Sequence, residues 1–290
     1  MGEKIGIALI GCGGMGNTHL ANLGQAPDAQ IVALCDIRRE ALEKTWKERF
    51  KGDPAIRLYD SMDQLLADPP ASLQAVLIAT PHTTHFGQAM ASLDKGWDVL
   101  LEKPMVTSSA DARALAEKVK SSGRQLQVAF QASYSAEFAY IRKLIQEGGL
   151  GELQTISAHS CQGWRPRGEH RTWRHDPKFS GGGQMYDTGA HLFNAIAWLI
   201  DRPAIEVFCW TDNKGMEVDI NAVMTIRWAA APGGGGGEVL GSVTISGNTP
   251  GWQEGIVLSG DKGRISTGIQ QNCQNVGLRK RGKNQRISAG

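Results

Sequence analysis

The sequence lacks any apolar run of the ~20 residues that a membrane-spanning helix requires. Residues 1–4 lead directly into a strand-like segment, without the apolar core of a signal peptide. The net charge is only +2, which provides no extended field for nucleic acid or a membrane surface. From these absences we expect a cytoplasmic protein that has no nucleic-acid partner and no membrane partner.

Cysteine is sparse as well, with five residues, an odd number, and no pair at CxxC spacing. Scattered reduced thiols fit this pattern better than a disulfide framework or a zinc site. Three histidines of the second half, His170, His175 and His191, could suggest a metal, but no helix-spaced pair of ligands supports one. The sequence therefore predicts no metal site.

The chain of 290 residues is long enough for two domains. Up to about residue 130, apolar β-branched runs alternate with helix-like segments, which is typical of a doubly wound parallel sheet. Beyond residue 150 a period of two dominates, which indicates strands joined by tight turns. We predict an α/β Rossmann domain over 1–130 and an α+β domain over 131–268, whose open, mostly antiparallel sheet has helices on one face. Residues 269–290 are polar and basic, and we expect a disordered or truncated tail there.

A glycine-rich stretch, GCGGMG, follows the first strand-like run, 4–10. It fits the GxGxxG pattern between a strand and a helix, in which the glycines allow a tight turn and close approach to a pyrophosphate. The free N–H groups of the following helix would hold the phosphates. The candidate cofactor-binding residues of this stretch are Gly11, Gly13, Gly14, Met15 and Gly16.

Asp36 ends the second strand-like run, twenty residues after Gly16. An acid at this place can accept hydrogen bonds from an adenosine ribose and would repel a 2′-phosphate, so the pattern favours NAD over NADP. Arg38 and Arg39 follow immediately and could pair with that phosphate, which leaves NADP open. The alternative is that Asp36 only caps a helix.

Polar residues follow two later strands of this first domain. Thr80 and Pro81 end the run 74–79, at the carboxyl edge where such sheets bind ligands. His85 begins the next helix and either lies near the cofactor or bonds a backbone group there. Glu102 and Lys103 end the run 98–101 and complete the candidate cofactor contacts.

In the second domain, Asp187 and His191 are four residues apart before an apolar helical stripe. On one helix they would share a face and point at one substrate. Near a helix N-terminus the histidine stays neutral more easily, which suits a general base. The alternative is a buried pair with satisfied hydrogen bonds.

The segment 161–179 is rich in tryptophan, arginine and histidine and has no periodicity, which predicts a long ordered loop over the substrate. Tryptophan faces suit the C–H surfaces of a sugar ring, and arginines suit its hydroxyls or a carboxylate. A subunit contact is the alternative, because both residue types are enriched at interfaces. The candidate substrate-binding residues are Tyr134, Trp164, Arg165, Trp173, Arg174, Asp187 and His191.

Taken together, GCGGMG, TPHTTH, LLEKP and the later GGxxxDxGxH pattern resemble the motifs of the Gfo/Idh/MocA family of nicotinamide-dependent sugar and polyol oxidoreductases. The resemblance runs from about residue 4 to about residue 265 and implies that Lys103 lies between nicotinamide and substrate. It also implies a cis bond before Pro104, and a catalytic set of Lys103, Asp187 and His191. Members of the family usually continue for several more strands and a helix, whereas this chain ends differently.

We therefore predict an oxidoreductase that uses NAD(H) on a secondary alcohol or ketone of a sugar, glycoside, cyclitol or polyol. One alternative is a glycosidase that uses bound NAD for transient oxidation, as some relatives do. A second alternative is an inactive NAD-binding paralogue or sensor. The second sheet shows apolar residues on both faces, with Phe208 and Trp210 opposite Val207 and Cys209, so we expect a homodimer or homotetramer through one of them.

Overall fold

The computed structural model describes residues 4–166, 171–231, 236–270, 273–280 and 283–288, with side chains up to residue 267. The chain divides into two compact units, Met1–Ala129 (unit 1) and Phe130–Gly290 (unit 2). Over the described ranges, every helix is too short or too polar to cross a membrane.

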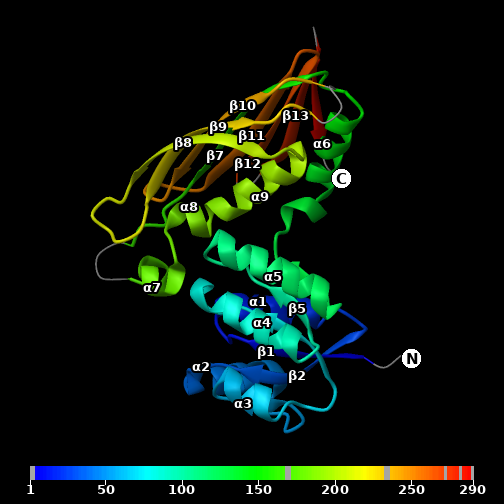
Figure 1. Ribbon diagram of the computed structural model, residues 1–290, viewed down its shortest axis with the longest axis vertical. Coiled ribbons are helices and arrows are strands. Elements are labelled where there is room, and N and C mark those ends of the chain that lie inside the picture. The colour runs from blue at the N-terminus through cyan, green and yellow to red at the C-terminus, as the bar shows by residue number, and fades with distance from the viewer. Residues whose placement is uncertain (1–3, 167–170, 232–235, 271–272, 281–282, 289–290) are drawn as a thin grey trace. The chain divides into compact units, whose positions relative to one another are not determined.

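Unit 1 is a six-stranded parallel sheet with helices between its strands (Figure 1). Its strand order, β3-β2-β1-β4-β5-β6, reverses direction between β1 and β4. The carboxyl ends of these two strands form a topological switch point, where open α/β sheets bind ligands. The elements are β1 (Ile5–Ile10), α1 (Gly14–Leu23), β2 (Ala29–Cys35), α2 (Arg39–Phe50), β3 (Arg57–Tyr59), α3 (Met62–Ala67), β4 (Leu73–Ile78), η1 (His82–Thr84), α4 (His85–Asp94), β5 (Asp98–Leu101), α5 (Ser109–Ser122) and β6 (Leu126–Val128).

Helices cover both faces of this sheet, which explains its nearly continuous apolar strands. On one face Ile10 packs in a core cluster that includes Leu115 of α5. On the other, Leu9 joins a cluster with Leu20 of α1 and Leu42 of α2. Burying one such side chain stabilises the fold by roughly 1.5–3 kcal/mol. The predicted doubly wound sheet is confirmed.

Unit 2 is an eight-stranded sheet in the order β14-β13-β12-β11-β7-β10-β9-β8. Only the central β7–β10 pair is parallel, so the predicted, mostly antiparallel sheet is confirmed. The elements are η2 (Ala132–Tyr134), α6 (Ala136–Gln146), β7 (Leu153–Cys161), η3 (Trp173–His175), α7 (Pro177–Ser180), α8 (Gln184–Asp187), α9 (Gly189–Ile200), β8 (Ala204–Asp212), β9 (Asn221–Trp228), β10 (Val239–Ser246), β11 (Gln253–Gly260), β12 (Gly263–Gln270), β13 (Cys273–Lys280) and β14 (Lys283–Ser288).

Helices α6 and α9 lie along one face of this sheet (Figure 1). Phe138 of α6 and Leu192 of α9 pack against Ile156 and Met224 of the sheet in one core cluster. The alternation along β9, with every second residue buried, follows from this one-sided cover.

The opposite face of the second sheet, which we call the free face, carries exposed apolar side chains. All nine residues of the edge strand β8 are exposed. Phe208 and Trp210 pair across to Thr225 and Val223, which alternate with the buried residues of β9 and so belong to the free face. The rings of Phe208 and Trp210 pack edge to face with centroids 4.4 Å apart. The free face is thus the side of Phe208 and Trp210, and not the side of Val207 and Cys209.

The end of the chain differs from the prediction of disorder over 269–290. The structure contains β13 and β14 there, which extend the sheet beyond β12 as two antiparallel hairpin strands. Antiparallel pairing satisfies backbone N–H and C=O groups without any apolar side-chain period. The polar sequence of these strands therefore gave no signal from which they could be predicted.

The four cysteines that the structure describes are free thiols. Burial raises the pKa of Cys12 and of Cys35 to about 12, with the nearby Asp36 charge acting in the same direction. Neither is therefore a reactive thiolate near neutral pH. No group of three metal-ligating side chains occurs among the described residues.

Candidate active site

The glycine loop of unit 1 lies at the switch point between β1 and β4. Gly11 has a φ of +100°, and a side chain on it would lie 2.5 Å from the carbonyl oxygen of Ala79, the residue that follows β4. A side chain on Gly16 would lie 2.0 Å from the carbonyl oxygen of Gly11. These two positions accept only glycine because the backbone folds tightly on itself there.

The N-terminus of α1 is free to bind an anion. Its N-cap is Gly13, which provides no side-chain hydrogen bond, and its first turn has no acidic residue. A side chain on Gly14 would meet nothing within 4 Å, so open space lies beside the first helical turn. Unpaired N–H groups at a helix start are a natural site for a pyrophosphate, and the loop therefore fits the phosphates of NAD.

Replacing Gly16 by alanine is expected to weaken NAD binding by about 10- to 100-fold, because overpacking of this size costs about 1–3 kcal/mol. The added carbon would overlap the Gly11 carbonyl oxygen, so the loop has to open. The NAD affinity is measured by adding NAD to the protein and following its tryptophan fluorescence. Gly87→Ala is the matched control, since Gly87 in α4 has no neighbour within 4 Å of an added carbon. Equal affinities for the two variants would contradict the tight-turn role of Gly16.

Asp36 is nearly buried after β2 and holds two backbone groups. Its Oδ2 accepts a hydrogen bond of 2.8 Å from Cys12 N–H, and its Oδ1 accepts one of 2.8 Å from Arg38 N–H. The N-cap of α2 is Arg38, so the alternative that Asp36 caps this helix is wrong. Each carboxylate oxygen keeps a second lone pair for a ribose hydroxyl.

The two arginines after Asp36 differ in their partners. The Nε of Arg38 lies 3.5 Å from Asp36 Oδ1, beside the loop. Arg39 instead donates to Glu43 and to Asp60. Of the two, Arg38 is therefore the arginine beside Asp36, and its contact with a 2′-phosphate stays a prediction.

Lys103 follows β5, the neighbour of β4 in the sheet. The N–H of Glu102 donates to the carbonyl of Ile78 at 2.9 Å, which fixes the start of the turn on β4. The Lys103–Pro104 bond is cis, which confirms the expectation from the resemblance. Lys103 therefore belongs to the carboxyl edge of the same sheet as the glycine loop.

The ring nitrogens of His85 contact backbone carbonyls. Its Nδ1 lies 2.8 Å from the carbonyl oxygen of Pro104 and its Nε2 lies 3.0 Å from that of Thr80. The residue is fully buried, and burial lowers the pKa of His85 although the two carbonyls act in the opposite direction. Both ring nitrogens thus meet the Thr80 and Pro104 turns, as the backbone alternative expects, and a cofactor contact of His85 stays a prediction. Thr80 itself donates to Gln88 Oε1 at 2.6 Å, and its role and that of Pro81 stay predictions.

Asp187 is the buried acid of unit 2. Its Oδ2 accepts hydrogen bonds from Trp164 Nε1 at 2.9 Å and from Arg174 Nε at 3.0 Å. Asp187 is 4% exposed, and the Arg174 side chain is 35% exposed. The guanidinium thus compensates a carboxylate that would otherwise be costly to bury.

The sequence predicted one helix that carries both Asp187 and His191, but the structure has two helices there. Asp187 ends α8, and His191 lies in the first turn of α9. The N–H of His191 bonds the carbonyl of Thr188, three residues back, at 3.1 Å. This tighter turn, next to the poor helix former Gly189, breaks the expected single helix. The half-buried ring of His191 meets the ring of Phe130 edge to face, with centroids 6.0 Å apart.

Side chains of the aromatic and basic segment 161–179 contact Asp187 and one another. Trp164 packs on the His175 ring with centroids 4.6 Å apart, and Arg174 lies 4.4 Å over the Trp173 ring. The segment includes η3 and α7, which the sequence did not predict. The indole Nε1 of Trp164 and the Nε of Arg174 bond Asp187, and the substrate contacts of these two residues stay predictions. Residues 167–170, with His170, lie outside the described residues.

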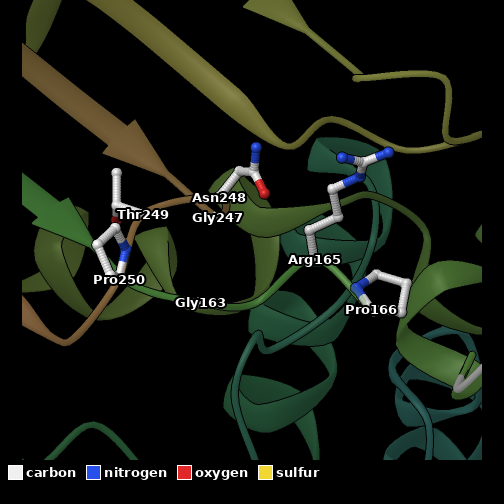
Figure 2. A pocket seen from close by; sticks show the side chains of 7 residues that line it. All are labelled: Gly163, Arg165, Pro166, Gly247, Asn248, Thr249 and Pro250. Atoms are coloured by element: carbon white, nitrogen blue, oxygen red, sulfur yellow. The ribbon is translucent and has the colours of Figure 1, made fainter. Parts of the chain in front are cut away.

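A small pocket next to Trp164 contains Arg165 (Figure 2). The N–H groups of Trp164 and Arg165 donate to the carbonyl of Gly247 at 2.8 and 2.6 Å, which joins this segment to the turn after β10. In Figure 2 the side chains of Arg165 and Asn248 extend to the same side of this junction. Tyr134, the remaining substrate candidate, is 73% exposed in η2.

Sequence reasoning missed two residues of the site. His19 on α1 contacts Glu102, with Nε2 and Oε1 2.6 Å apart. Asp219 accepts the N–H groups of Gly183 and Met185 at 2.8 Å each and so starts α8. Both contacts join residues more than thirty positions apart, and no local pattern signals them.

Residues 5–130 match the family model described as oxidoreductase family, NAD-binding Rossmann fold, and residues 138–266 match the GFO/IDH/MocA C-terminal domain. The chain is 30% identical to an inositol 2-dehydrogenase of Streptomyces avermitilis over 204 residues, which cover 70% of this chain and 55% of that protein. An inositol 2-dehydrogenase of Rubrobacter xylanophilus is 27% identical over 91% of this chain and 71% of its own length.

Among solved structures, the chain resembles the WlbA dehydrogenase from Chromobacterium violaceum, in complex with NADH and UDP-GlcNAcA. The TM-score is 0.81 at 25% identity, over 92% of this chain and 75% of that chain. The chain spans little more than half the length of the Streptomyces relative.

Proposed function

Because the chain belongs to the GFO/IDH/MocA oxidoreductase family, with an NAD-binding Rossmann domain, we propose that it is a dehydrogenase. Its reaction transfers a hydride between NAD(H) and a secondary alcohol or ketone of a sugar, glycoside, cyclitol or polyol. The observation that carries the proposal lies in unit 1, where the glycine loop after β1 and Lys103 after β5 share the carboxyl edge of one sheet. That edge is where a dinucleotide and its reaction partner bind.

The roles proposed for the side chains follow from the chemistry of alcohol oxidation. When bound, NAD⁺ accepts the hydride from the carbon that carries the hydroxyl. His191, as a neutral imidazole, takes the hydroxyl proton. Lys103 donates a hydrogen bond to the same oxygen and so favours the developing charge. Asp187, fixed by Trp164 and Arg174, supplies the negative charge that favours a protonated His191.

The substrate class is supported by the Arg165 pocket. A guanidinium and the Asn248 amide on one side of a small cavity suit a carboxylate or neighbouring hydroxyls of a sugar derivative. Relatives with names that refer to a cyclitol and a structure solved with a nucleotide-linked sugar acid fit the same class. We propose that Arg165 contacts the part of the substrate away from the reacting carbon.

The test is NADH formation at 340 nm across a panel of sugars, cyclitols, polyols and sugar acids, with NAD⁺ and NADP⁺ in separate arms. Activity with NAD⁺ on at least one member is the expected result. Aglycone release from a glycoside with no added NAD⁺ and no net NADH would instead show the glycosidase. Binding of NAD⁺ with no turnover on the whole panel would contradict the dehydrogenase and favour a sensor.

We propose further that the free face of the second sheet joins two or four copies of the chain. Phe208, Trp210, Val223 and Leu240 are each about half exposed or more, and large apolar side chains gathered on one sheet face mark a candidate interaction surface.

Replacing Trp210 by glutamate is expected to weaken the association by at least about 30-fold, since buried tryptophans at interface centres contribute roughly 2 kcal/mol or more. Sedimentation velocity over a concentration series measures the shift toward monomer. Tyr140→Glu on α6, which lies on the helix-covered side, is the control. An unchanged assembly state in the Trp210 variant would contradict this use of the free face.

A further inference from the structure

A histidine and a carboxylate from distant parts of unit 1 form a close, nearly buried pair. His19 lies in the second turn of α1, and its Nε2 is 2.6 Å from Oε1 of Glu102. The two side chains are 18% and 9% exposed.

The second oxygen of Glu102 serves the next residue. Its Oε2 accepts a hydrogen bond of 3.1 Å from the backbone N–H of Lys103. The backbone N–H of Glu102 also donates to the carbonyl of Ile78 on β4, so hydrogen bonds hold both the backbone and the side chain of Glu102. The carboxylate thereby determines the direction in which the chain leaves β5 and presents Lys103.

We propose that His19 is a positioning residue for Lys103, acting through the Glu102 carboxylate. This inference rests on the proposed function of Lys103. The pair joins α1, whose first turn is the glycine loop, to the turn that carries the lysine. The same hydrogen bond thus keeps the lysine in register with the helix that holds the phosphates.

The charges around Glu102 show why a carboxylate is used here. Burial alone would raise the pKa of Glu102, but the His19 hydrogen bond and charge, then the Lys103 N–H and charge, outweigh it and lower the pKa. The groups that face it are His19 from α1, Lys103 beside it, and His85 from α4, whose pKa responds to the Glu102 charge. A carboxylate that remains ionised holds both donors at once, which a neutral acid does less well.

The experiment compares His19→Ala, His19→Gln and Asn22→Ala in the full-length protein, on a substrate found in the panel above. Asn22 is an exposed residue of the same helix and is the control. We measure kcat, KM and NAD affinity. His19→Ala should lower kcat by about 10- to 100-fold, because a displacement of about 1 Å in a reacting group has such an effect. NAD affinity should change less than about threefold.

Two readouts separate positioning from a merely structural role. The first is NAD affinity, which a general loss of folding would lower together with kcat and which the positioning role leaves within about threefold. The second is rescue: His19→Gln should recover most of kcat, because its amide N–H can still donate to the carboxylate. An unchanged kcat in His19→Ala, or no recovery in His19→Gln, would overturn the inference.

Lys103→Met, measured in parallel, distinguishes failure of this inference from failure of the proposed function. If Lys103→Met is inactive while His19→Ala has full activity, only the positioning role is wrong. If Lys103→Met keeps full activity, the mechanism proposed for the lysine is wrong and the His19 role falls with it.

Discussion

Replacing Lys103 by methionine is expected to lower kcat by about 10²- to 10⁴-fold, the usual contribution of a group that handles a proton or charge at the reacting oxygen. Methionine keeps most of the apolar length of lysine and removes only the ammonium, so the turn after β5 should fold unchanged. NAD affinity should stay within about threefold, because the glycine loop and Asp36 are untouched. Steady-state kinetics on the best substrate, together with an NAD titration, measures both quantities.

The control for Lys103 is Lys95→Met, at an exposed position just before the same strand. It should leave kcat unchanged, since a surface lysine that far from the carboxyl edge takes no part in the reaction. Lys103→Arg tests geometry, because a planar guanidinium cannot place its donors as a single ammonium does, and little activity should return. Full activity in Lys103→Met would remove the lysine from the mechanism.

The cofactor loop was the part of the site that the sequence could predict best, because the spacing of its glycines is local, although the Ala79 carbonyl that excludes a side chain at Gly11 lies far along the chain. Gly11 and Gly16 are dictated by contacts of the loop with its own strand and with Ala79. Asp36 stands at a fixed distance along the chain from that loop, and its carboxylate does bond the loop at Cys12 N–H. Short-range spacing and backbone conformation were sufficient here.

The surroundings of the acid in unit 2 could not be predicted, because they depend on long-range contacts. Asp187 meets Trp164 and Arg174 from positions 23 and 13 residues earlier, and nothing in the local pattern separates a ligand-binding arginine from an ion-paired one. The start of α8 depends on Asp219, from a later segment, and the break before α9 depends on a single tight turn at Thr188. The strands β13 and β14 were missed for a related reason, since edge pairing leaves no apolar signature.

The position of His85 shows the same limit within unit 1. Its place after Thr80 and Pro81 allowed either a cofactor contact or a backbone contact. The carbonyl of Pro104, nineteen residues later, provides one of the two backbone contacts that the structure shows. A sequence pattern can place a histidine at the carboxyl edge of a sheet, but only the fold of the neighbouring turn determines which way its ring nitrogens are used.

Replacing Asp187 by asparagine is expected to lower kcat by about 10²- to 10⁴-fold if the carboxylate favours the protonated base, as proposed. Asparagine keeps the shape and one oxygen acceptor for Trp164 Nε1, so the loss is chiefly of charge. The free energy of unfolding should fall by about 1–3 kcal/mol, because the Arg174 guanidinium then donates to a neutral amide oxygen and no longer to a carboxylate. Because the Arg174 guanidinium is partly exposed, we expect a loss of unfolding free energy toward the lower end of this range.

Arg174→Met is the variant that separates the two uses of Asp187. It removes the ion pair and leaves the carboxylate, with Trp164 still able to donate to it. A catalytic Asp187 predicts that Arg174→Met loses stability comparable to Asp187→Asn but loses less than about tenfold in kcat, because the charge that acts on the base is still present. A purely structural Asp187, the alternative that the sequence left open, predicts equal effects of the two variants on kcat and on unfolding. Kinetics and urea denaturation on the same preparations therefore decide between a buried ion pair that only holds the segment 161–179 and a carboxylate that takes part in the reaction.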